Sequence, residues 1–207
     1  MTPDLNHITD LATLDALYGP PNDTSIYKEV NHLHPLYRHL VEAAPFAVLA
    51  TSGPLGLDAS PRGDAAGLVT VEDEHTLLLP DRRGNNRADS LRNIVTDPRV
   101  ALLFMVPGVG ETLRINGRAT ISIEPALLAR FVVDGHAPRS VLVVTIETVY
   151  FQCSRAIVRA QLWDATRHVP RGRLPSAGTI LSALTQSAID GDAYDRELPA
   201  RVRSSLY

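Results

Sequence analysis

The chain has 207 residues, 44% of them hydrophobic, and carries a formal net charge of −3 with a sequence pI near 6.1. This length and composition can bury the core of one domain with extensions, so two independent domains are not expected. The acidic balance and an aromatic content of 5% argue against partners such as nucleic acid or an anionic membrane, which need basic steering and, for bases, stacking surfaces.

Cysteine and histidine usage also limits the possible sites. Cys153 is the only cysteine, which excludes an intrachain disulfide and a multi-thiolate metal centre. His32, His34 and His39 lie close together in the sequence, but no carboxylate or thiolate pattern supports them, so we predict no metal site. Residues 1–6 lack a basic region followed by an apolar stretch, and no apolar run approaches membrane-spanning length. We therefore expect a soluble cytoplasmic protein.

The first predicted elements are helical. Apolar residues recur at helical spacing between Ile26 and Val41. Pro35 is expected to open a second helix, because proline is favoured at the first helical position. Residues 1–45 are therefore expected to form a helical lead-in.

From residue 46 the pattern indicates β-structure. Pro125 to Val133 interrupts it as a short helix with proline in the first turn. Six or so strands at short spacing, linked by Gly, Pro and Asp turns, favour a closed barrel over a βαβ sheet. We expect a mainly β fold with flanking helices, with strands at residues 46–51, 67–71, 76–79, 100–106, 112–123 and 141–150.

A further helix is expected at residues 86–95. Asn85 or Asn86 can cap it, with Ala88, Leu91 and Val95 on the inward face. An anion bound before this helix would gain from its dipole. After residue 164 the sequence predicts a loop rich in Pro and Arg and then helical turns around residues 179–188. This extension is expected to close over a site or to reach a partner subunit.

Two loops give the strongest functional signal. Residues 60–64 and 80–87 each lie at the end of a β-patterned run and are rich in Arg, Asn and Gly. Arginine presents a planar fork of donors that matches phosphate, asparagine adds amide donors, and glycine lets the backbone approach an anion. Residues 80–92 hold four arginines against two aspartates. A single Arg-rich turn is as often solvated surface, but the pair of loops favours a site for a phosphorylated small molecule.

These loops, together with residues 46–51, 97–100 and 111–119, resemble the FMN-binding split-barrel proteins related to pyridoxamine 5'-phosphate oxidase. The resemblance runs from Phe46 to Trp163, and the helical lead-in also fits it. It implies a six-stranded split β-barrel that forms a homodimer and holds FMN at the dimer interface. We therefore divide the chain into a lead-in at 1–45, a barrel at 46–163 and a C-terminal extension at 164–207 that packs on the barrel or on the partner subunit.

The resemblance also implies which residues bind the cofactor. Arg114 and Asn116 are candidates near the edge of the flavin ring, from the same or the partner subunit, although Asn116 is about as well explained by a bond to a neighbouring backbone. No catalytic residue can be named. The first loop is expected to contribute Ser60 and Arg62, and the second Pro80, Asp81, Arg82, Asn85, Asn86 and Arg87.

The function implied is that of an FMN-dependent oxidoreductase, which transfers a hydride between flavin and a small organic substrate or a nicotinamide. The alternative is a flavin-binding carrier or sensor without turnover. A third reading is a different cofactor, such as a deazaflavin or haem, although no histidine falls inside the matched loops as an axial ligand. Residues 197–207 do not reproduce the Arg-Leu-x-Pro ending of the family's true oxidases, so the vitamin substrate is not implied.

Overall fold

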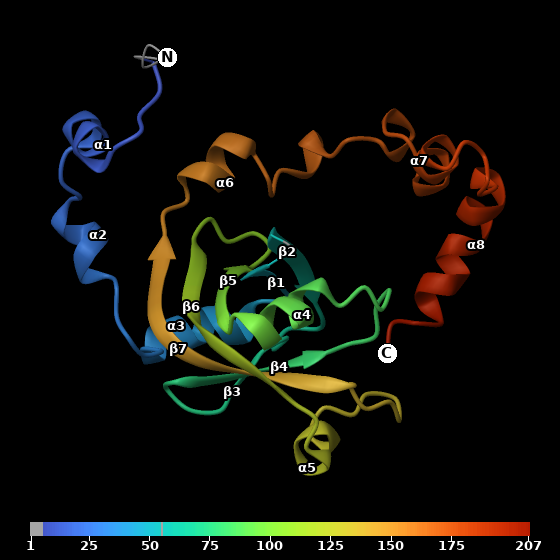
Figure 1. The fold of residues 1–207 in the computed structure, drawn as a ribbon, viewed down its shortest axis with the longest axis horizontal. Coiled ribbons are helices and arrows are strands. Elements are labelled where there is room, and N and C mark those ends of the chain that lie inside the picture. Colours follow the sequence, from blue (N-terminus) through green and yellow to red (C-terminus); the bar gives the residue numbers. More distant parts are fainter. Residues whose placement is uncertain (1–5, 55) are drawn as a thin grey trace.

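The computed structural model describes residues 6–54 and 56–207. Within them, one antiparallel sheet has the strand order β2-β1-β5-β6-β7-β4-β3, with helices around it (Figure 1). This confirms the mainly β class with flanking helices, with seven strands in place of six. The strands are β1 (Phe46–Gly53), β2 (Gly56–Gly63), β3 (Thr70–Val71), β4 (Thr76–Asp81), β5 (Arg99–Met105), β6 (Thr112–Ser122) and β7 (Ser140–Gln152).

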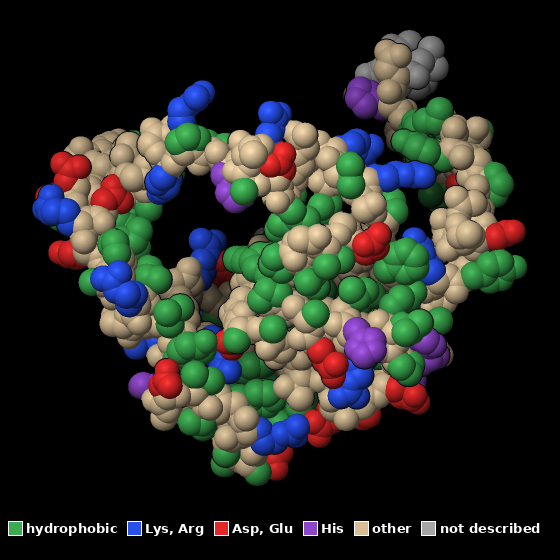
Figure 2. Space-filling view, turned by 180° about the vertical axis from the view of Figure 1, so that it is seen from behind, with side chains coloured by type: hydrophobic (Ala, Val, Ile, Leu, Met, Phe, Trp, Pro, Cys, Tyr) green, Lys and Arg blue, Asp and Glu red, His purple; other side chains and the backbone are tan. Residues whose placement is uncertain are grey.

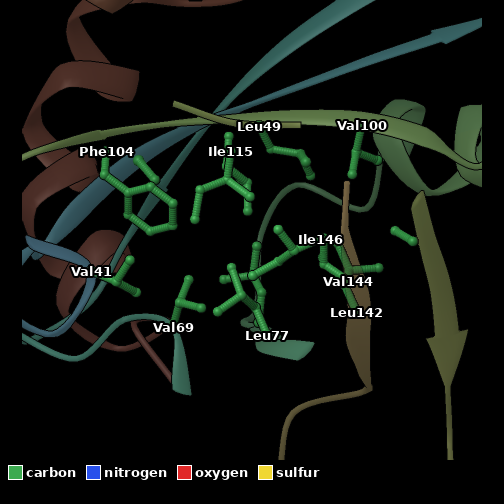
Figure 3. Packing of buried hydrophobic residues seen from close by; sticks show 14 of the residues in the cluster. Val41, Leu49, Val69, Leu77, Val100, Phe104, Ile115, Leu142, Val144 and Ile146 are labelled. Atoms are coloured by element: carbon green, nitrogen blue, oxygen red, sulfur yellow. The ribbon is translucent and has the colours of Figure 1, made fainter. Parts of the chain in front are cut away.

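The sheet curves around a single hydrophobic core. Alternate residues of β1, β5 and β6 are buried, as expected for strands with one face inward. Phe104 and Leu49 are among the largest fully buried side chains, and Val41 joins them from the lead-in (Figure 3). The core is therefore built mainly from the strands that the apolar pattern predicts.

Strand β2 corrects the prediction that residues 60–64 form a loop. All of Gly56–Gly63 pairs with β1, with Ser60 opposite Leu49 and Arg62 opposite Ala47. The strand lies at the edge of the sheet, where both faces are largely exposed and Pro61 is tolerated, so it shows no apolar alternation. The predicted strand at 67–71 is also shorter, because only Thr70–Val71 pairs.

In the lead-in, the predicted helical stretch from Ile26 ends at Tyr27 and Val30 forms a β-bridge with Val149, whereas the helix opened by Pro35 is confirmed. Pro35 lies in the first turn of α3, and Pro125 in that of α5, although α5 ends before the predicted Val133. No helix in the described part of the chain is both long and apolar enough for a membrane span. The helices are α1 (Leu11–Tyr18), α2 (Asp23–Tyr27), α3 (Pro35–Ala43), α4 (Asp89–Thr96), α5 (Pro125–Ala129), α6 (Arg155–Ala160), α7 (Ala177–Leu184) and α8 (Gly191–Arg203), with 3-10 turns at Ala165–Arg167 and Arg171–Arg173.

Helix α4 follows the Arg-rich loop as predicted, but its start and its inward face differ. It begins at Asp89, after Ala88 in a left-handed conformation, and no side chain caps it. Val95 is 76% exposed, whereas Asn93 is buried and its Nδ2 donates to Thr51 Oγ1 at 3.1 Å. The buried face of α4 therefore consists of Ser90, Asn93 and Ile94, with Leu91 only partly buried.

Residues 164–207, which we call the C-terminal arm, extend away from the barrel and return to it only at their end (Figure 1). Within the arm, α7 packs against α8, where Asp195 accepts hydrogen bonds from the Gly178 backbone N–H and from Ser176. The space-filling view shows open space between the arm and the barrel (Figure 2). The arm meets the barrel again through Tyr207, whose hydroxyl donates to Asp64 Oδ1 at 2.8 Å.

Candidate functional site

A cavity of about 670 Å³ lies where β2, the loop after β4 and the start of α4 meet. Its wall consists of residues 58–62, 81–91, 139 and 140, so the two segments singled out by the sequence meet at one place. Its volume is in the range of small-molecule sites, roughly 300–1,000 Å³.

The structure brings together most of the ten candidate cofactor residues. Pro80 is buried in β4 opposite Val141 and does not line the cavity. Arg114 and Asn116 lie on β6, away from it. The seven that line the cavity are Ser60, Arg62, Asp81, Arg82, Asn85, Asn86 and Arg87.

Arg62 is held in place by two hydrogen bonds. Its Nη1 donates to Asp81 Oδ1 at 2.6 Å, and its Nη2 donates to Ser90 Oγ at 3.3 Å. Ser90 in turn donates to Asp58 Oδ2 at 2.5 Å, so the network joins β2, β4 and α4. In the described part of the chain, the buried Nε of Arg62 has no hydrogen-bond partner. An unpaired buried donor costs roughly 1–3 kcal/mol, which an acceptor on a bound ligand would remove.

Arg82 is fixed at one side of the cavity. Its Nε donates to Asp64 Oδ2 at 2.9 Å and its Nη1 to the carbonyl oxygen of Phe131 at 2.6 Å, while its guanidinium lies 5.4 Å from the centre of the Tyr207 ring. Burial acts to raise the pKa of Asp64, but hydrogen bonds from Tyr207, the Ala65 backbone and Arg82 together hold that pKa below its ordinary value. The charged carboxylate is therefore favoured in the folded state.

Arg139 is a cavity residue that the sequence reasoning missed. Its Nη1 donates to Asn86 Oδ1 at 2.8 Å, and Asn86 has the left-handed φ of 62°. Arg139 directly precedes β7, whose Ser140 pairs with Asp81. Pairing the predicted strand at 141–150 with the one at 76–79 would have brought Arg139 beside the Arg-rich loop.

Basic side chains dominate the cavity wall. Among the described residues that line it, five arginines face three aspartates. Arg62 pairs with Asp81, and Arg87, which is largely exposed, pairs with Asp89. Arg83 and Arg139 form no ion pair with any described residue, so the wall carries an excess of positive charge that favours an anionic ligand.

Arg114 and Asn116 lie on the other face of the sheet. Their neighbours Leu113 and Ile115 are buried in the core, so both candidates are on the outer face of β6. The Nη1 of Arg114 donates to the hydroxyl of Tyr150 at 2.8 Å, across the β6–β7 ladder. A single chain therefore does not bring these two residues to the cavity.

Comparison with known proteins gives a match to one family. The family model described as pyridoxamine 5'-phosphate oxidase matches residues 33–153. No curated protein matches the chain. Similar solved structures include HupZ of Group A Streptococcus, a proposed pyridoxamine 5'-phosphate oxidase from Lactobacillus delbrueckii, and general stress protein 26 from Bacillus anthracis.

These structural similarities are distant. HupZ has 17% identity and a TM-score of 0.46, with 56% of this chain and 90% of HupZ covered. The Lactobacillus protein has 21% identity and a TM-score of 0.46, with 58% and 95% covered. The Bacillus protein has 15% identity and a TM-score of 0.42, with 55% and 88% covered. With identities and TM-scores this low, the three structures do not indicate which ligand or activity this chain has.

The contact between Asp64 and Arg82 predicts a pH-dependent stability. Because the folded-state pKa of Asp64 is lowered, its contribution is present above the unfolded value near 3.8 and is lost as the pH falls through the folded value. Asp64→Asn should lower the free energy of unfolding at pH 7 by about 1–3 kcal/mol, and by less below about pH 3.8. Urea unfolding at pH 7 and at pH 3 measures both differences.

Tyr207→Phe is the matched comparison, since it removes one hydrogen bond to Asp64 and leaves the carboxylate in place. Tyr207→Phe should also lower the free energy of unfolding at pH 7, but by less than Asp64→Asn does. An equal effect of Asp64→Asn at both pH values would contradict this account.

Proposed function

The chain belongs to the pyridoxamine 5'-phosphate oxidase family, and from this premise we propose that it is an FMN-dependent oxidoreductase whose arginine-lined cavity binds the FMN phosphate. The observation that carries the proposal is the joining of two Arg-bearing segments at one cavity, with Arg62 held between Asp81 and Ser90. A small organic molecule or a nicotinamide would exchange the hydride.

The donors at this cavity fit a phosphate group. Arg62 retains a buried Nε without an acceptor among the described residues. Arg83 and Arg139 line the cavity and form no ion pair with a described carboxylate, although Arg139 donates one hydrogen bond to the neutral Asn86. The first turn of α4 has no side-chain cap, so its backbone N–H groups add further donors at the cavity wall. Arg62, Arg83, Arg139 and this turn are the groups we assign to the phosphate, with Ser60, Asn85 and Asn86 as neutral polar neighbours.

The aspartates in the wall are assigned a positioning role. Asp81 and Ser90 fix the Arg62 guanidinium before a ligand arrives, so little side-chain freedom is lost on binding. Bound FMN would supply the hydride chemistry. The contribution of the protein would be placement and charge, which agrees with the absence of any catalytic acid or base that we can name.

We also propose a homodimer. On the outer face of the sheet, Arg114 and Asn116 share a surface with the partly exposed Val48 and Leu103, since the strand register places these residues in neighbouring rows. A second copy packed on this face would cover the apolar side chains and bring the partner's Arg114 toward the flavin. Exposed Ile180 and Leu184, on α7 of the C-terminal arm, would pack on that second copy.

The homodimer predicts a sedimentation mass of twice 22.5 kDa. Leu103→Glu would place a charge in the proposed interface and should shift the protein toward the monomer, because an unpaired charge resists burial. Leu57→Glu, at a site 88% exposed on β2, is the control. A monomeric wild-type protein at micromolar concentration would refute the homodimer.

The phosphate assignment predicts a difference between FMN and riboflavin, which lacks the phosphate. Arg139→Ala should weaken FMN binding about tenfold or more, because a charge-assisted contact worth roughly 1.5–3 kcal/mol is lost. Riboflavin affinity should not change. Fluorescence titration of the flavin measures both affinities.

Arg99→Ala removes an arginine that pairs with Asp97 and does not line the cavity, so it should leave FMN affinity unchanged. Equal affinities for FMN and riboflavin in the wild-type protein would mean that the phosphate is bound elsewhere or not at all.

Oxidoreductase activity predicts loss of flavin absorbance when the FMN-loaded protein is mixed anaerobically with NADH or NADPH, and its return when oxygen is admitted. The reason is that flavin absorbs visible light strongly only when oxidised. Free FMN at the same concentration is the control. If neither nicotinamide bleaches the bound flavin faster than free FMN, a nicotinamide donor is excluded, which leaves an oxidase of a small organic substrate or the carrier or sensor alternative.

A further inference from the structure

A second, smaller cavity of about 180 Å³ lies against the one described above. Arg82, Arg83 and Arg139 line both cavities and therefore stand between them. The other residues of the smaller cavity are His136, Ala137, Pro138 and Tyr207. Its wall thus combines the Arg-rich loop, the segment before β7 and the end of the C-terminal arm.

The wall of the smaller cavity carries less negative charge than that of the larger cavity. None of the described residues that line it is an aspartate or a glutamate, whereas the larger cavity has three aspartates. Two carboxylates lie nearby. Asp64 is already engaged with Arg82 and Tyr207, and its hydrogen bond with the Tyr207 hydroxyl is the main cause that raises the pKa of Tyr207, to which the charge of Asp134 adds. Arg83 and Arg139 remain without an ion pair among the described residues, so the cavity is suited to an anion.

Tyr207 gives this cavity a defined shape. Its hydroxyl is bound to Asp64, and its ring lies 5.4 Å from the Arg82 guanidinium, so both side chains are held in place. The tyrosine comes from the C-terminal arm, 143 positions from Asp64 in the sequence. The arm therefore supplies one wall of a basic cavity on the barrel.

The volume limits what can enter. It equals the liquid volume of about six water molecules, at about 30 Å³ each. This is enough for a phosphate group, or for a carboxylate with a few carbon atoms, and too little for a whole flavin nucleotide. Each guanidinium carries five donors, so an arginine between the cavities can serve an anion on either side.

We propose that the smaller cavity is a second anion subsite, which binds the carboxylate or phosphate group of a second ligand next to the FMN phosphate. The statement that FMN lies next to this subsite rests on the function proposed above. The subsite itself is inferred only from the residues that line the smaller cavity. The anionic group has two possible sources, the acid group of the substrate or a small free anion that binds alongside it.

Titration of the FMN-saturated protein with inorganic phosphate tests the proposal, because FMN then fills the larger cavity. Calorimetry at low ionic strength should detect one phosphate site per chain. Ala137→Glu adds a carboxylate at an exposed position that lines only the smaller cavity, and Ala137→Gln is the neutral control of the same size. Ala137→Glu should weaken phosphate binding at least about tenfold relative to Ala137→Gln, since a like charge opposes the anion.

Ala137→Gln should keep FMN affinity within about threefold of the wild type, because Ala137 does not line the larger cavity. Ala137→Glu should weaken FMN binding less than it weakens phosphate binding, because its carboxylate reaches the FMN phosphate only across the arginines that line both cavities. The proposal is overturned if the two variants bind phosphate equally, or if saturating FMN abolishes phosphate binding in the wild-type protein. Measuring phosphate binding by the two Ala137 variants in FMN-free protein tests the subsite independently of the proposed FMN function. A failure to bind FMN would then refute the proposed function, while a phosphate site weakened by Ala137→Glu would still support the subsite.

Turnover assays distinguish the two sources. If the subsite holds the acid group of the substrate, phosphate should inhibit competitively against that substrate and Ala137→Glu should raise its KM. If it holds a free anion, phosphate should change the rate without competing. Either result supports an anion subsite. If phosphate does not change the rate at concentrations that saturate the site detected by calorimetry, the proposed role of the subsite in the reaction is overturned.

Discussion

The site depends on the ion pair between Arg62 and Asp81, which joins edge strand β2 to the end of β4. No described strand pairs with the outer side of β2, so main-chain hydrogen bonds hold it only to β1. Arg62 supplies a second attachment through Asp81 and through Ser90 at the start of α4, and Ser90 is bound to Asp58. Both partners of the ion pair are largely buried, so loss of either would leave a charge without its partner and would loosen the wall of the cavity.

Carboxylates in a cavity proposed for phosphate have a clear physical role. Asp81 holds one guanidinium by one edge, and Asp64 does the same for Arg82 from outside the larger cavity. An arginine positioned in this way loses less freedom when an anion arrives than a free surface arginine does. The remaining positive charge comes from Arg83 and Arg139, and both lie in the wall shared by the two cavities. Positioning and net charge are thus carried by different arginines.

The sequence predicts those parts of the fold in which apolar residues alternate or recur, namely β1, the strands from β4 to β7, and α3. It does not predict β2, because the polar residues of that strand serve the cavity and only the pairing with β1 makes it a strand. The inward face of α4 depends on Asn93 and its distant partner Thr51, which no local pattern reveals. The two Arg-bearing segments singled out by the sequence line one cavity, whereas Arg139 reaches it through the β4–β7 register. Strand alternation places Arg114 and Asn116 on the outer face, but one chain does not determine what covers them.

A crystal structure of the chain grown with FMN tests the central claim most directly, because it reports where the phosphate lies as well as whether the cofactor binds. We expect the phosphate oxygens to lie within hydrogen-bond distance of the guanidinium groups of Arg62 and Arg139, with the Arg62–Asp81 ion pair intact. A flavin phosphate bound at another surface, with the arginine-lined cavity holding only solvent, would contradict the account.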